Sequence, residues 1–158
     1  MTITRAIKEL IAFELAVVKG IREKELEFIA GGKDLWERCL PRLINPIREE
    51  WFTHNQSRIS NMFYAGESSL SHRTMLAEGP VQSFAISKDR FRKVLLSAEL
   101  APLVKNLEPY RIEVWHYDPA VLGTSDEVDI LSLYLSMRDL DDERIKGALE
   151  DLLMKVKW

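Results

Sequence analysis

The first fifteen residues carry apolar side chains at the spacing of a helix. Between Thr2 and Leu15, four apolar residues recur at i, i+4, i+7 and i+8, which is one stripe of a helix with 3.6 residues per turn. These residues are Ile3, Ile7, Leu10 and Ile11. The opposite side is polar and partly basic, with Thr2, Thr4, Arg5, Lys8 and Glu9. The pattern predicts an amphipathic helix that presents a basic face.

Two β-rich runs follow this helix. They extend from Ala16 to Lys19 and from Ile21 to Ile29, on either side of Gly20. Because glycine lacks a Cβ atom, it tolerates the positive φ angle that a tight turn requires. We therefore expect a β-hairpin that turns at Gly20, with the basic residues Arg22 and Lys24 close to its tip.

The helix and hairpin together resemble the recognition helix and wing of winged-helix transcription regulators. The stretch that carries the resemblance is TITRAIKELIAFELAVVKGIREKELEFIAGG, residues 2–32. In that family, a helix of the form x-T-x-x-R-A-I-x-x-L places short polar and basic side chains against base edges of the major groove. The resemblance implies double-stranded DNA as the partner and a homodimer as the binding form. It assigns the DNA contacts to Thr2, Thr4, Arg5, Lys8, Arg22 and Lys24.

The chain departs from the winged-helix pattern at two points. Such proteins often place glycine after the recognition helix, where this chain has Glu14. The family also has two helices before the recognition helix, whereas here only Met1 precedes it. Two interpretations follow: the chain is a truncated or C-terminal portion of a longer regulator, or the helix packs on something else.

The rest of the chain, residues 33–158, shows three strand patterns among its helices. The strands are predicted from Ile47 to Thr53, from Val81 to Ile86 and from Arg111 to Tyr117. The third run contains large aromatic residues and is bounded by prolines, so we expect it at the centre of a sheet.

Helices are predicted between and after these strands. One begins at Asp34 as its N-cap, one covers Glu67 to Leu76 with Leu70 and Met75 facing inward, and one follows Ser87 as its N-cap. Val128 to Met137 is apolar enough to be buried, and a closing helix runs from Asp141 or Asp142 towards Val156. The predicted fold is α+β: a partial winged helix at residues 1–32 joined to a small mixed α/β regulatory or interaction domain at residues 33–158.

A second resemblance concerns this C-terminal part. The runs AGESSLSHRTMLAEGPVQSFAIS, RIEVWHYDP and VDILSLYLSMRDLDDERIKGALEDLL resemble the C-terminal half of the type IV abortive-infection antitoxins. Those proteins join a winged helix to an α/β domain. The resemblance implies that this part contacts a protein partner such as a toxin, or DNA, and is not catalytic.

Charge and composition exclude some classes of function but do not identify a single one. Residues 1–24 hold five basic and three acidic side chains, so that a net charge of +2 stands against −3 for the whole chain. This asymmetry is typical of a basic tip on an acidic body. No apolar run approaches the length of a membrane span, and no signal peptide is evident, so we expect a cytoplasmic protein away from membranes. The single cysteine, Cys39, is expected to be a buried, inert thiol.

Candidate catalytic residues are few and fit structural roles. His116 and Asp118 point to the same side of a strand, as a base and its orienting group would, but no further ligand set accompanies them. Ser68, Ser69 and Ser71 adjoin His72 without the nucleophile-elbow motif. We therefore predict no enzyme, no cofactor and no metal, and expect a DNA-binding transcriptional regulator. The alternative is an antitoxin-like protein-interaction module with little DNA binding of its own.

Overall fold

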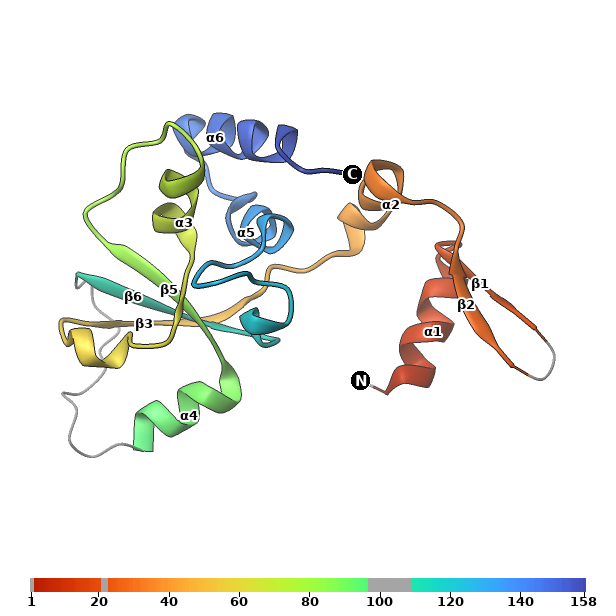
Figure 1. Cartoon of the computed structure of the whole chain (residues 1–158), viewed down its shortest axis with the longest axis horizontal. Helices are drawn as coiled ribbons and strands as arrows, with labels where there is room; N and C mark the ends of the chain where they lie inside the picture. Colours follow the sequence, from red (N-terminus) through yellow and green to blue (C-terminus); the bar gives the residue numbers. More distant parts are fainter. Residues whose placement is uncertain (1, 21–22, 97–108) are drawn as a thin grey trace. The chain divides into compact units, whose positions relative to one another are not determined.

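The structure is a computed structural model of the chain, and it describes residues 2–20, 23–96 and 109–158. The chain forms two compact units (Figure 1). Unit 1 comprises Met1–Leu43 together with Lys157–Trp158, and unit 2 comprises Ile44–Val156. In the parts described, no helix combines the length and the apolar character needed to cross a membrane.

Unit 1 contains the predicted helix and hairpin. Helix α1 spans Ile3–Ala12, and strands β1 (Ala16–Lys19) and β2 (Glu25–Phe28) pair antiparallel, so that Ala16 lies opposite Phe28. Gly20 has a φ angle of +90°, as the turn requires. The second strand is shorter than predicted, and Ile21 and Arg22 lie outside the described residues.

Helix α2 (Gly32–Cys39) and a 3-10 turn, η1 (Leu40–Arg42), complete unit 1. The N-cap of α2 is Gly31, so the prediction that Asp34 caps this helix is wrong. Asp34 lies inside the first turn, where a negative charge favours the helix dipole, and its carboxylate accepts a hydrogen bond of 3.1 Å from Arg38 one turn later. The predicted boundary between the two parts lies after residue 32, whereas unit 1 extends to Leu43, because α2 and η1 group with the hairpin.

Glu14 ends α1 in the conformation that glycine usually adopts. Its φ angle is +55°, in the left-handed region. The amide of Leu15 donates to the carbonyl of Leu10 and the amide of Glu14 donates to that of Ile11, both at 3.0 Å. This bonding pattern is the Schellman motif, which satisfies carbonyl groups at the helix end. The glutamate therefore forms the expected cap at the cost of a strained backbone.

We expect Glu14→Gly to stabilise the end of α1 by about 0.5–1 kcal/mol, because relief of the left-handed strain exceeds the backbone entropy that glycine loses on folding. Slower hydrogen exchange of the Leu15 amide would show this local effect. Glu14→Ala removes the same charge but keeps the strain, so it should not slow the exchange. Equal protection in both variants would contradict the backbone explanation.

Unit 2 is built on a four-stranded sheet in the order β3-β6-β5-β4. The strands are β3 (Ile47–Thr53), β4 (Phe63–Tyr64), β5 (Gln82–Ser87) and β6 (Tyr110–Trp115). The β3–β6 and β4–β5 pairs are antiparallel, whereas β5 and β6 run parallel. The predictions for all three strands are therefore confirmed to within a few residues, and β6 lies centrally, as expected.

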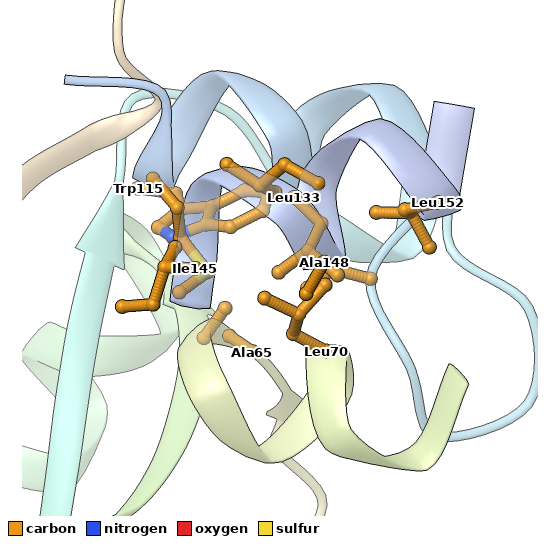
Figure 2. Close-up of a cluster of buried hydrophobic side chains, with 11 residues drawn as sticks. Ala65, Leu70, Trp115, Leu133, Ile145, Ala148 and Leu152 are labelled. Carbon is orange, nitrogen blue, oxygen red and sulfur yellow. The ribbon is translucent and has the colours of Figure 1, made fainter. Parts of the chain in front are cut away.

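Helices cover both faces of this sheet. Alternate residues of β5 and β6 point to opposite sides, so both faces carry apolar side chains that pack against helices. On one side, α3 (Gly66–Arg73), α5 (Ile130–Met137) and α6 (Glu143–Met154) enclose a core that contains Trp115, Leu70, Leu133 and Leu152 (Figure 2). On the other side, α4 (Lys88–Leu96) contributes Phe91 to a smaller core with Phe84, Ile86, Ile112 and Val114. The mixed α+β prediction is confirmed.

Polar side chains set the ends of these helices. Asp142 is the N-cap of α6 and accepts from the amide of Arg144 at 2.9 Å, which confirms one of the two predicted capping residues. Helix α3 ends at Arg73, because Thr74 is extended and its hydroxyl donates to the carbonyl of Leu70 at 2.8 Å. Leu70 is buried as predicted, but the inward orientation predicted for Met75 is wrong, since its side chain is 98% exposed.

Candidate nucleic-acid interface

An open groove lies between α1 and the hairpin of unit 1. Its volume is about 400 Å³. Helix α1 contributes Thr4, Ile7 and Lys8 to its walls, and the hairpin contributes Val18, Lys24, Glu25 and Leu26. The groove thus has an apolar floor with two lysines and one glutamate among its walls.

Three of the six residues predicted to contact DNA line this groove. They are Thr4 and Lys8 on α1 and Lys24 on the hairpin, and all three side chains are exposed. Local folding explains this convergence, since the hairpin returns along the helix that precedes it in the chain.

The other predicted DNA contacts stand apart from the groove. Thr2 is the exposed N-cap of α1, although its side chain forms no capping hydrogen bond. Arg5 is exposed, and its Nε donates to the Glu9 carboxylate at 2.9 Å. Arg22 lies outside the described residues.

Charge in unit 1 is mixed and only slightly positive. By sequence, the unit holds nine basic and seven acidic residues, a net charge of +2, which leaves −5 for unit 2. Lys19 pairs with Glu27 across the hairpin, and Glu25 stands in the groove beside Lys24. In the groove, the positive charge available to a polyanion comes from Lys8 and Lys24.

Unit 1 also exposes an unusual amount of apolar surface. None of the side chains of α1, all of which the structure describes, is buried, and Ile3 is 82% exposed. Further large apolar residues on this unit are exposed: Ile11, Phe13, Val17, Val18, Leu26, Phe28 and Ile29. A surface with so many apolar side chains is typical of a protein-interaction site.

A second pocket in unit 1, of about 240 Å³, lies between α1 and α2. Its walls are largely apolar, and the Arg42 guanidinium stacks over the Phe13 ring at 4.5 Å from the ring centre. Cys39 lines this pocket and is half-buried, so its thiol is less enclosed than we predicted.

The serine and histidine of α3 bind one carboxylate instead of each other. Glu127 accepts from the Ser69 hydroxyl at 2.7 Å, lies 2.8 Å from His72 Nδ1 and accepts from Arg73 Nε at 2.7 Å. Partial burial raises the pKa of Glu127, but these three partners outweigh it and hold the pKa below its ordinary value. Because Ser69 is fully buried and directed at Glu127, this cluster is an anchor for the segment before α5.

His116 and Asp118 do not act together as a base and its orienting group. The Asp118 carboxylate accepts from the amide of Ala120 at 3.1 Å and caps the turn η3 (Pro119–Val121), while His116 is exposed. Within the described ranges, no three His, Cys, Asp or Glu side chains gather closely enough to hold a metal ion.

The sequence analysis missed a polar ladder on β6. Arg111, Glu113 and Trp115 alternate along this strand and therefore share one face. Glu113 is fully buried and accepts from Arg111 Nη2 at 2.6 Å and from Trp115 Nε1 at 3.1 Å. Burial raises the pKa of Glu113 despite both donors. The signal in the sequence that could have predicted this ladder was the alternation of an arginine and a glutamate inside an otherwise apolar strand.

Gly66 makes room for this ladder. Its φ angle is +51°, and a Cβ atom there would lie 2.9 Å from Arg111 Nη2 and 3.0 Å from Glu113 Oε1. Both the conformation and the close approach of the backbone require glycine.

Comparison of the chain with models of known protein families, with curated proteins and with solved structures finds no match.

Proposed function

We propose that unit 1 binds double-stranded DNA and that the protein acts as a transcriptional regulator. The observation that supports this function is the groove where Thr4 and Lys8 of α1 meet Lys24 of the hairpin. A helix and a β-ribbon that present polar and basic side chains on one side can place the helix against base edges and the ribbon against phosphate. In this proposal, α1 enters the major groove.

Arg5 contributes to binding after exchanging its partner. Its bond to Glu9 joins exposed residues one helical turn apart, and such pairs contribute only about 0.3–0.5 kcal/mol. A DNA phosphate can therefore replace Glu9 at small cost. Thr2, exposed at the N-terminus of α1, stands where helix ends commonly approach the DNA backbone. Arg22, which lies outside the described residues, is proposed to contribute a phosphate contact as well.

Salt dependence of DNA binding tests this function. We expect Lys8→Ala/Lys24→Ala to weaken binding and to reduce the slope of log K against log salt by about 0.9, since Lys24 on the ribbon supplies one phosphate contact whereas Lys8 on the helix faces base edges. Fluorescence anisotropy of a labelled duplex between low and physiological salt measures the slope. Lys93→Ala/Lys157→Ala removes two exposed lysines outside the groove and should leave the slope unchanged.

The proposal would be abandoned if the wild-type chain failed to bind DNA at low salt, or if both double variants changed the slope equally.

A second candidate function then takes precedence: a protein-interaction module that uses the exposed apolar side chains of unit 1. The supporting observation is the exposure of Ile3, Ile11 and Phe13 around α1. The homodimer that the winged-helix resemblance implies could form through the same apolar surface. Sedimentation of wild type against Ile11→Glu tests whether two copies associate through it.

A further inference from the structure

The pocket between α1 and α2 is small and almost entirely apolar. Its volume is about 240 Å³. Six of its lining residues carry no charge: Ala6, Leu10, Phe13, Leu15, Cys39 and Leu43. Leu15 is 4% exposed and so belongs to the inner wall. Sites for drug-sized molecules usually measure about 300–1,000 Å³, so this pocket suits a smaller molecule.

The two charged residues of the pocket, Glu9 and Arg42, already have partners. The Glu9 carboxylate accepts from Arg5 Nε at 2.9 Å. The Arg42 guanidinium lies 4.5 Å from the centre of the Phe13 ring, and its Nη1 donates to the carbonyl of Arg38 at 3.3 Å. A charged ligand would therefore lose its hydration in the pocket without meeting an unpaired counter-charge. The walls favour a neutral ligand.

Water that enters the pocket finds few hydrogen-bond partners. A water molecule held inside a protein usually forms about two to four hydrogen bonds. The uncharged side chains of the wall offer only the Cys39 thiol, which is a weak donor and acceptor. An engineered apolar cavity of about 150 Å³ takes up benzene. The larger pocket of this protein therefore favours an apolar molecule of one or two rings.

Two wall residues favour an aromatic molecule over an aliphatic one. Phe13 is 46% exposed, and aromatic rings attract each other in offset-stacked or edge-to-face arrangements. The Cys39 sulfur is a soft, polarisable atom, which suits contact with a ring. Because Arg42 already covers part of the Phe13 ring, the incoming ring meets a wall that is partly assembled.

We propose that this pocket binds a small, neutral aromatic molecule of about the size of indole. The ring lies between α1 and α2, against Leu10, Phe13 and Leu15. None of the side chains of α1 is buried without a ligand, so the additional burial stabilises this helix. The pocket uses a different flank of α1 from the groove that holds Thr4 and Lys8, and the proposal does not rest on DNA binding.

Binding of indole to the full chain tests this proposal, with the Cys39 thiol as a reporter. Because Cys39 is the single cysteine of the chain, mass spectrometry follows its alkylation by iodoacetamide without interference. We expect indole to bind saturably by isothermal titration calorimetry and, at saturation, to slow the alkylation at least threefold. Indole-3-acetate and tryptamine, which add a negative and a positive charge, should bind at least tenfold more weakly.

Two leucine substitutions on α1 connect binding to the pocket. Ala6→Leu adds bulk to the wall and should weaken indole binding at least tenfold. Ala12→Leu adds the same bulk to the same helix at an exposed position outside the pocket, and should bind as wild type does. Alanine and leucine both favour helices, so neither change opposes α1. Amide spectra that match wild type outside the pocket show that the variants are folded, and the charged indoles test the same site on the wild-type chain.

The proposal is overturned if indole does not bind, if it leaves the alkylation of Cys39 unchanged, or if either charged compound binds as tightly as indole. Equal binding by Ala6→Leu and Ala12→Leu would also overturn it. Tighter binding of N-acetyl-tryptophanamide than of indole would do the same, because the occupant would then be a side chain of a protein partner. None of these measurements involves DNA, so failure of either proposal leaves the other standing.

Discussion

Replacing Arg111 by methionine is expected to lower the free energy of unfolding of unit 2 by about 3–5 kcal/mol, the range for breaking a buried ion pair from one side. Glu113 is fully buried, and without Arg111 it would keep only the Trp115 indole as a donor. The carboxylate would then be charged and largely unpaired, or would bind a proton. Urea unfolding at pH 7, combined with hydrogen exchange of the β6 amides, reports the effect on this unit.

The pH dependence of the same variant follows from the pKa of Glu113. Burial raises this pKa in the folded protein, so between the ordinary glutamate value and the folded value the folded state binds a proton that the unfolded state releases. The contribution to stability is present below the ordinary value and is lost as pH rises through the folded value. Removing Arg111 raises the folded pKa further, so the deficit of Arg111→Met should shrink as the pH is lowered.

The double variant Arg111→Met/Glu113→Gln is the control for this prediction. It removes both charges, and replacing both members of a buried pair is often close to neutral. We therefore expect it to recover most of the stability lost in the single variant. A single variant that costs less than about 1 kcal/mol, or a double variant that is no better, would show that the pair is not what stabilises this face of the sheet.

The elements that could be predicted from sequence are those whose signals are local. Strand β3 occupies the predicted residues, Ile47–Thr53, because its β-rich run is bounded by loop residues. The cap of α6 at Asp142 was likewise visible in a few consecutive residues. The prediction that Asp34 is an N-cap failed because an aspartate suits both an N-cap and an ion pair within the first turn. Only the backbone conformation decides between these two roles.

The groove of unit 1 and the polar ladder of unit 2 differ in how far they could be predicted. Lys8 and Lys24 belong to neighbouring elements, so a helix followed by a hairpin was enough to bring them together. Arg111 and Gly66 are far apart in sequence, and their close approach depends on the parallel pairing of β5 with β6 and on the left-handed conformation of Gly66. Periodicity reports which residues face inward but not which element they face.

Truncation of Leu152 to alanine should lower the free energy of unfolding of unit 2 by about 2–5 kcal/mol, the range for leucine in a well-packed core. Leu152 is fully buried on α6 and lies in the core beside Leu70 and Ala148, as Figure 2 shows. The loss combines the transfer free energy of the removed methyl groups with the cavity that remains, because side chains from three helices and the sheet cannot all close in on it.

Met154→Ala provides the matched control two residues further along α6. Its side chain is 76% exposed, so its truncation should change the free energy of unfolding by no more than about 0.5 kcal/mol. Urea denaturation followed by far-ultraviolet circular dichroism compares both variants, with equal m-values as the sign that only stability has changed. Similar losses in the two variants would contradict the placement of α6, since its apolar stripe would then not separate a core-facing side from a solvent-facing one.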